Sequence, residues 1–287
     1  MARIILISLL LTSVFIANGQ DDLLSMLEEE IADETFPVEA TFKGTRLING
    51  HSIETRKKNN FDFLISHRFG LISGGAYELF GLDQSNVRIG FDYGLTDYFN
   101  IGIGRNSFEK TYDSYLKYRI LRQTSGKKSM PVSVTIFLST AVETLKNNNK
   151  SVIADMSYAN QILIARKFTP ALSLQIMPTY VHFNKIEATQ LRNDIWSLGA
   201  GGRLKLTQRI SLNAEYYYQK APLSDNTFNS LAIGFDIETG GHVFQLQFTN
   251  SQSMIEKGFI TETYNDFFKG DIHFGFNISR TFQLAKE

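Results

Sequence analysis

From Phe61 to the end of the chain, large apolar side chains alternate with polar or small ones at a period of two. This alternation constrains the fold more than any other feature. Clear examples begin at Phe61, Val87 and Phe99. Successive side chains of a β-strand point to opposite faces, so each run predicts a strand with one apolar and one polar face. About twelve such runs follow one another, each of roughly nine to fifteen residues. The pattern therefore predicts an all-β protein.

The length of the runs separates two kinds of β protein. Strands of soluble sandwiches usually have about five or six residues, whereas a strand that crosses a bilayer with a strong tilt needs about 9 to 11. Bacterial outer-membrane barrels also have even strand numbers. We therefore predict an antiparallel transmembrane β-barrel of about 12 strands over residues 59–287. The alternative is a soluble sandwich or a lipocalin-like barrel.

The connections between the runs alternate in length. In outer-membrane barrels the periplasmic turns are short and the extracellular loops are longer, so the alternation predicts that both termini lie on the periplasmic side. Exceptions are the tight connection at 108–110 and the longer one at 123–130. The other short connections are 96–98, 167–170, 205–209 and 238–241, and the long ones are 70–85, 143–151, 184–192, 220–227 and 251–270. The last of these has room for a helical turn.

Aromatic side chains recur near both ends of the predicted strands, in the phase of the apolar face. Two aromatic girdles that flank an apolar band are typical of membrane barrels. The alternative explanation is the general preference of aromatic residues for strands, which accounts for their number but not for their placement. The predicted inner-rim residues are Phe61, Tyr93, Phe99, Phe235 and Phe282, and the predicted outer-rim residues are Phe69, Tyr112, Tyr180, Trp196 and Tyr218.

Residues 1–19 have the composition of a secretory signal peptide. Arg3 precedes an apolar run over residues 4–16, and the small residues Ala17 and Gly19 follow it. The run is too short to span a bilayer, which takes about 20 residues. We therefore expect the segment to be cleaved and the mature protein to reach the outer membrane. The chain contains no cysteine, which excludes disulfides and thiolate chemistry.

Residues 20–58 form a separate N-terminal segment that begins acidic. Residues 22–32 carry leucines and an isoleucine at helical spacing, which predicts a short periplasmic helix; a solvated tail is the alternative. We expect this acidic tail to contact a periplasmic protein partner. Further along, Asn49-Gly50 predicts a two-residue hairpin turn between residues 45–48 and 51–55.

The polar face of each predicted strand is expected to line the interior, because an Arg that faced lipid at the midplane would cost about 2–4 kcal/mol. Both signs of charge occur there, which favours neither anions nor cations. The lumen-lining candidates are Asp62, Arg68, Arg88, Asp92, Lys117, Arg119, Asp155, Arg203, Glu215, Asp236, Asp271 and His273.

Inward glycines gather on neighbouring strands. One hypothesis is that they form a smooth wall against which residues 41–55 fold as a plug inside the barrel; the other is that they permit curvature of the barrel. The glycines are Gly90, Gly94, Gly102, Gly104, Gly199 and Gly201, and the plug candidates are Thr45, Arg46, Asn49, Gly50 and His51.

The sequence offers little sign of an active site. A barrel hydrolase would need a serine paired with a histidine on one face, and none of the five histidines has such a serine. The histidines are also scattered, without metal-ligand spacing. We therefore expect no enzyme activity, no metal and no cofactor. Lys plus Arg equals Asp plus Glu at 29 each, which argues against nucleic-acid binding.

Three stretches resemble a family of outer-membrane β-barrel proteins of unknown function from Gram-negative bacteria. They are ATFKGTRLINGHSIE at 40–54, HRFG with GGAYELFGLDQ within 67–84, and FDYGLTDYFNIGIGRNSFEKTYD at 91–113. The resemblance covers the chain after about residue 38. It implies a membrane barrel and supplies no catalytic residues and no substrate.

We therefore expect a channel or uptake pore for small solutes in the outer membrane. The barrel would lie in outer-membrane lipid and be inserted by the barrel-assembly machinery. A non-conducting docking barrel with a periplasmic partner is the alternative from another class, and a barrel hydrolase is the third.

Overall fold

The computed structural model describes residues 34–146, 151–185, 188–239 and 242–284. The predicted signal peptide and the predicted helix at 22–32 lie outside the described residues. By Cα proximity the chain divides into two units, which are described separately: residues 39–122 with 132–287, and residues 1–38 with 123–131.

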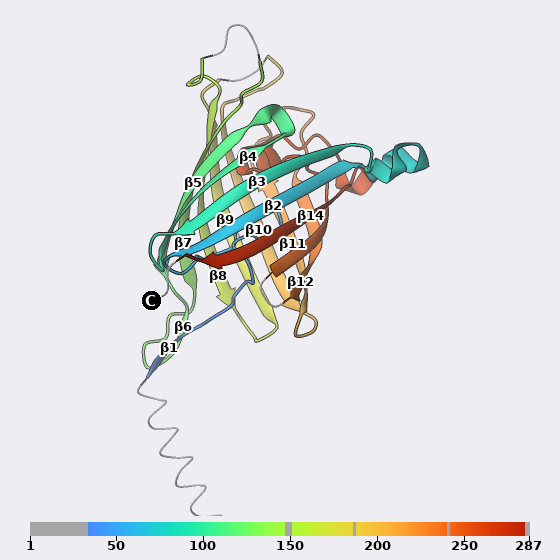
Figure 1. Ribbon diagram of the computed structural model, residues 1–287. Coiled ribbons are helices and arrows are strands. Elements are labelled where there is room, and N and C mark those ends of the chain that lie inside the picture. The colour runs from blue at the N-terminus through green and yellow to red at the C-terminus, as the bar shows by residue number, and fades with distance from the viewer. Residues whose placement is uncertain (1–33, 147–150, 186–187, 240–241, 285–287) are drawn as a thin grey trace, which may run out of the picture. The chain divides into compact units, whose positions relative to one another are not determined.

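The larger unit is a closed barrel of twelve strands (Figure 1). Each strand pairs antiparallel with the next strand of the barrel, and the last pairs with the first to close it. This confirms the predicted fold class and strand number. The strands are β2 (Asn60–Leu71), β3 (Ser85–Gly94), β4 (Phe99–Asn106), β5 (Tyr112–Leu121), β7 (Ser133–Val142), β8 (Met156–Lys167), β9 (Leu172–Phe183), β10 (Asp194–Lys205), β11 (Ile210–Gln219), β12 (Ser230–Thr239), β13 (His242–Thr249) and β14 (His273–Gln283).

The smaller unit contains a two-stranded sheet of β1 (Thr35–Pro37) and β6 (Thr124–Gly126). The main chain of Val38 donates to the Gln123 carbonyl at 2.8 Å, which extends the pairing by one residue. A Cβ at Gly126 would lie 2.1 Å from the Glu34 carbonyl oxygen. Only glycine therefore permits this close approach of the two strands.

The described helices lie in the connections between barrel strands. They are the 3-10 segments η1 (Ile72–Gly81), η2 (Phe108–Lys110) and η3 (Phe267–Lys269), and the α-helix α2 (Glu256–Thr261). The expected helical turn in 251–270 is therefore α2, near the C-terminal end of the chain. Within the described residues, every helix is too short or too polar to cross a membrane.

The two faces of the barrel wall differ in the way that a membrane requires. On β9, Met177 and Val181 point inward and have no exposed surface, whereas the outward Ile176 is 48% exposed. Outward side chains are mostly large and apolar, so lipid rather than water satisfies this surface. Outward aromatic rings also meet across neighbouring strands, such as Tyr180 with Trp196 at 4.9 Å between ring centroids.

A charge placed on the outward face should therefore destabilise the barrel. We expect Ile176→Arg, near the middle of β9, to lower the free energy of unfolding in lipid vesicles by about 2–4 kcal/mol. The matched control is Val152→Arg, in the exposed connection before β8, which should have little effect. Equal stability of the two variants would contradict the assignment of faces.

Candidate functional site

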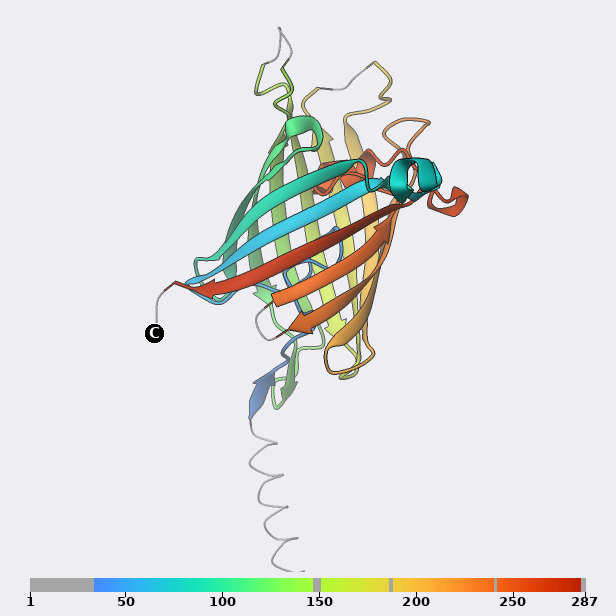
Figure 2. The same ribbon diagram turned by 45° about the vertical axis from the view of Figure 1, so that its right-hand side comes forward.

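Two segments that are not part of the wall fill the interior of the barrel. The first, which we call the plug, is residues 41–56 ahead of β2. The second, which we call the inner loop, is residues 250–263 between β13 and β14, and it includes α2. Nearly all side chains of both segments are buried. Figure 2 shows the blue plug segment inside the ring of strands.

The plug turns back on itself as a tight hairpin. Arg46 and His51 form a β-bridge, and the main chain of Leu47 donates to the Gly50 carbonyl at 2.8 Å. The two turn residues are therefore Ile48 and Asn49, so the predicted Asn49-Gly50 turn was wrong by one residue. Gly50 does not have a positive φ. It is needed instead because a Cβ there would lie 2.1 Å from the Tyr217 hydroxyl oxygen.

The tip of the plug surrounds the carboxylate of Glu215, which is buried on the inward face of β11. Three consecutive main-chain amides donate to it: Ile48 at 3.2 Å, Asn49 at 2.7 Å and Gly50 at 3.2 Å. Successive amides arranged in this way form an anion-binding nest, and hydrogen bonds to a carboxylate are stronger than neutral ones. Hydrogen bonds to Glu215, and not a standard hairpin-turn geometry, therefore fix the conformation of the turn.

The carbonyls at the tip are satisfied from the opposite direction. Gln245 on β13 donates to the Leu47 carbonyl at 3.0 Å, and Asn277 on β14 donates to the Ile48 carbonyl at 3.0 Å. Buried main-chain groups need such partners, since an unpaired one costs about 1–3 kcal/mol. The wall thus supplies donors and acceptors that match the plug.

The remainder of the plug is bound from most sides of the barrel. Counting the tip as well, side chains of ten strands contact the plug: β2, β3, β4, β5, β7, β9, β11, β12, β13 and β14. The contacts beyond the tip include Thr45 with Asp92 (3.0 Å), Gln175 with the His51 carbonyl (2.8 Å), Thr135 with the Ile53 carbonyl (3.2 Å), Lys117 with the Glu54 carbonyl (2.5 Å), Arg119 with the Glu54 carboxylate (3.2 Å), and Arg56 with Asp62.

An apolar cluster shares the interior with these polar groups. The plug contributes Phe42, Leu47 and Ile53 to it, and the inner loop contributes Phe259 and Ile260. The interior therefore also holds apolar side chains beside the polar ones that the sequence predicted there. Several strands carry apolar residues on both faces, and a period-two pattern cannot separate such faces. The wall members of the cluster are Tyr115, Phe137, Ala159, Leu163, Ala165, Met177, Val181, Phe183, Ile195 and Tyr217.

The inner loop is fixed through the ammonium of Lys257, which is 2% exposed. It pairs with Glu143 at 2.7 Å, with Glu262 at 2.8 Å and with Glu109 at 3.1 Å. Burial disfavours the charge of Lys257, but the three carboxylates outweigh it and raise its pKa. Burial raises the pKa of Glu262 in spite of the neighbouring ammonium. The connections after β4 and β7 therefore hold α2 inside the barrel.

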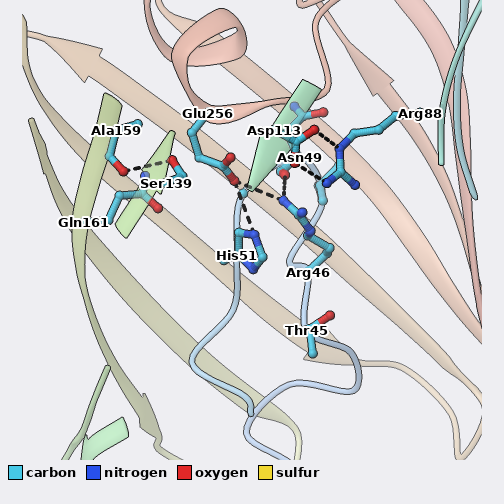
Figure 3. A network of polar contacts seen from close by, with 12 residues as sticks. Thr45, Arg46, Asn49, His51, Arg88, Asp113, Ser139, Ala159, Gln161 and Glu256 are labelled. Carbon is cyan, nitrogen blue, oxygen red and sulfur yellow. Dashed lines mark hydrogen bonds and ion pairs between the residues drawn. The ribbon is translucent and has the colours of Figure 1, made fainter. Parts of the chain in front are cut away.

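The plug and the inner loop meet at Glu256, the neighbour of Lys257. Its carboxylate accepts from Arg46 at 3.0 Å and lies 3.5 Å from Nε2 of His51 (Figure 3). Burial raises the pKa of Glu256, although Arg46 opposes the shift. Burial and then the charges of Arg46 and Lys117 lower the pKa of His51 well below its ordinary value. We call Arg46, His51 and Glu256 the latch.

The structure places most of the predicted interior residues inside the barrel. Arg119 is half-buried at its contact with Glu54. Asp155 and Asp271 lie instead in connections, just before the first residues of β8 and β14. Their strands begin later than the pattern indicated, because a turn over 151–155 and the main-chain bonds at 269–272 occupy these positions. The buried candidates are Asp62, Arg68, Arg88, Asp92, Lys117, Arg203, Glu215, Asp236 and His273, and the plug candidates Thr45, Arg46, Asn49, Gly50 and His51 also lie inside.

The inward glycines make room in two ways. A Cβ at Gly94 would lie 2.2 Å from the Lys57 carbonyl, and one at Gly201 would lie 2.3 Å from Leu47, so both admit the N-terminal segment. Gly90 and Gly104 leave space for the Arg88 guanidinium instead. Gly102 and Gly199 leave space for Tyr115 and Tyr217. The plug is therefore one reason for these glycines, and large side chains of the wall are the other.

His273, the inward histidine at the start of β14, is fully hydrogen-bonded. His273 donates from Nδ1 to the Phe69 carbonyl at 2.8 Å, and its Nε2 accepts from Asn265 at 2.9 Å. Both ring nitrogens are thus used in joining β14 to its surroundings. Among the described residues, acidic and histidine side chains do not come together in threes in a way that could hold a metal ion.

Several residues of the site lay outside the sequence prediction. Gln175, Gln245 and Asn277 are uncharged, and many other inward residues do not touch the plug. The strand pattern therefore could not single these three residues out. Glu256 and Lys257 lie in a connection with no strand periodicity. The only available signal was the unusual length of the connection at 251–270.

Fold and interior together define a membrane β-barrel whose interior is occupied by two segments of its own chain. Residues 42–282 match the model of the family described as Membrane bound beta barrel domain (DUF5777). The chain belongs to this family. A search of curated proteins found no match.

Solved structures with a similar fold include three from outer membranes. The NanC porin has a TM-score of 0.49 and 10% identity, with 78% of this chain and 100% of that chain covered. The KdgM porin has a TM-score of 0.47 and 9% identity, with coverage of 78% and 99%. The Acinetobacter baumannii outer membrane protein Omp33 has a TM-score of 0.43 and 10% identity, also with coverage of 78% and 99%.

The nest at Glu215 should control how firmly the tip of the plug is held. We expect Glu215→Gln to raise the hydrogen-exchange rates of the amides of residues 48–50 at least about tenfold, the equivalent of about 1.4 kcal/mol, because the charged acceptor is lost. Exchange read by mass spectrometry measures this. Asp113→Asn is the matched control, since that buried carboxylate pairs with Arg88 of the wall. Unchanged exchange at the tip in Glu215→Gln would refute the anchor.

Proposed function

We propose that the protein is an outer-membrane pore for small solutes that is closed in this conformation. It opens when the plug leaves its socket, by which we mean the inward side chains of the wall that bind the plug. The observation that carries the proposal is the meeting of two inserted segments at the latch. Neither segment is a strand of the wall, so the barrel can stay closed as a sheet while they move. The predicted export signal and the alternation of connection lengths support an outer-membrane location with periplasmic termini.

The contacts of the plug suit a reversible closure. Its tip is held by hydrogen bonds and its latch by an ion pair, and water can replace such contacts at a small net cost. The wall behind the plug carries both signs of charge, including the buried pair of Arg88 with Asp113 at 2.5 Å. A wall of this kind would be wetted after the plug leaves and would not favour one sign of solute.

One observation favours a second candidate, a non-conducting barrel that presents its surface or its acidic tail to a partner. The apolar side chains of the plug pack with Phe137, Met177 and Tyr217 of the wall as in a protein core. Exposing such side chains to water opposes opening by about 1.5–3 kcal/mol for each fully buried side chain. In this case the plug would be permanent, and its role would be to fill the barrel.

Bilayer recording separates the two candidates. We expect the purified protein to show rare openings and a variant lacking residues 41–56 to show sustained conductance, because the deletion removes the plug but no wall strand. Heat-modifiable migration on a detergent gel checks that the variant folds, and Glu215→Gln serves in its place if the deletion does not. Silence at all voltages of the variant that folds would refute the pore and support the non-conducting barrel.

The latch should make opening depend on pH through His51. Its pKa is lowered in the closed state, so the closed state binds fewer protons than an open state in which His51 meets water. Opening is therefore favoured as the pH falls through the ordinary histidine value of about 6.5. The raised pKa of Glu256 acts in the opposite direction, since closing then takes up a proton.

The contribution of His51 can be isolated by comparing two pH values. We expect the ratio of open probability at about pH 5 to that at about pH 7.5 to be larger in the wild type than in His51→Gln, because only the wild type gains a proton at this position. If the substitution changes the open probability by the same factor at both pH values, this change cancels in the ratio. Equal ratios would show that His51 does not sense pH.

A further inference from the structure

The connection between β2 and β3 exposes an unusual number of apolar side chains. Tyr77 is 95% exposed, Leu79 and Phe80 are each 55% exposed, and Leu82 is 45% exposed. All four lie in or directly after η1. Glu78 is the only charged residue in residues 72–82, and the segment has no Lys or Arg. In water this surface would be unfavourable, because exposed apolar groups gain when they are removed from contact with water.

The backbone holds two of these side chains in a conformation that L-residues seldom adopt. Leu79 has φ 46° and ψ 45°, and Phe80 has φ 54° and ψ 38°. This left-handed region costs free energy for any residue with a Cβ. Gly81 follows at φ 87°, where a Cβ would lie 2.5 Å from the Gly70 carbonyl oxygen. Close contact with the end of β2 thus fixes the segment while Leu79 and Phe80 stay outside.

The exposed segment continues the lipid-facing belt of the barrel. Phe69 of β2 points outward and stacks on Phe274 of β14 at 5.7 Å, and η1 begins three residues after Phe69. The main chain of Ile72 donates to the Ile272 carbonyl at 2.8 Å. This contact joins η1 to the connection that carries Phe268, which is 86% exposed. In Figure 1 the teal coil of η1 extends sideways from the wall and not across the end of the barrel.

We propose that residues 72–82, together with Phe268, form an interfacial anchor that lies among the lipid headgroups beside the barrel. Lipid is the occupant that the observations favour, because the segment adjoins an outward aromatic belt and leaves the wall in the direction of the membrane plane. Tyrosine and phenylalanine with aliphatic neighbours suit the boundary between headgroups and acyl chains. That the leaflet is the outer one rests on the orientation in the proposed function.

Tryptophan fluorescence tests the anchor directly, since Trp196 is the only tryptophan of the chain. Phe80→Trp would be introduced into a Trp196→Phe background and reconstituted in phosphatidylcholine vesicles. We expect lipid brominated near the headgroup end of its acyl chains to remove roughly half of the fluorescence. Iodide present on both sides of the bilayer should have little effect.

The matched control is Val152→Trp in the same background. Val152 is 69% exposed and lies in the connection between β7 and β8. Iodide should quench the fluorescence of this control, and brominated lipid should not.

Two outcomes would overturn the anchor. The first is quenching of the Phe80→Trp variant by iodide without quenching by brominated lipid, which would place position 80 in water. The second is protection from iodide that disappears at a lower protein-to-lipid ratio, which would make a second copy of the protein the occupant. Neither outcome depends on conductance, so the anchor can fail while the proposed pore stands.

Discussion

The structure depends on a constraint of size: a barrel of twelve strands encloses more space than its own side chains can readily fill. The outer face meets lipid, but an empty interior would leave the inward polar groups of the wall to water or without partners. This chain meets the constraint with its own residues, from the N-terminal plug and from the inner loop. The wall matches these segments. It has glycines where the main chain of the plug or an aromatic ring of the wall comes close, and it has side-chain amides where the plug presents its carbonyl groups.

The interior combines two kinds of stabilisation that respond differently to opening. Glu215, Gln245 and Asn277 give the plug a specific position, since each reaches a particular main-chain atom. The apolar cluster around Phe137 and Tyr217 adds free energy with little directional preference. The balance between them decides whether the plug is a gate or a permanent core. Glu256 and Lys257 are neighbours in α2, so the contact of the plug at the latch and the ion pairs with the connections after β4 and β7 meet on one short helix.

Most of the wall could be predicted from the sequence, because a period of two is a direct consequence of strand geometry. Asp62, Arg68 and Arg88 fell on the correct face for that reason. The hairpin at 45–55 was expected, but its register was not, because Glu215 rather than a local turn preference positions residues 48–50. Local sequence cannot report a partner about 165 residues away. The apolar cluster was also missed, since Met177 and Ile195 are apolar residues within inward faces that also carry serine, glutamine, threonine, glycine and arginine.

The hydrogen bond of Asn277 to the Ile48 carbonyl joins residues 229 positions apart. Its acceptor lies in the first part of the described chain, and its donor belongs to the last strand. The socket of the plug is thus complete only after β14 has paired with β2 and every earlier strand is in place. Contacts over such a separation form late, because the entropy of the intervening chain opposes them. Seating of the plug therefore marks the end of assembly: a barrel still open at its seam has no complete socket, and it stays unsealed until its last strand arrives.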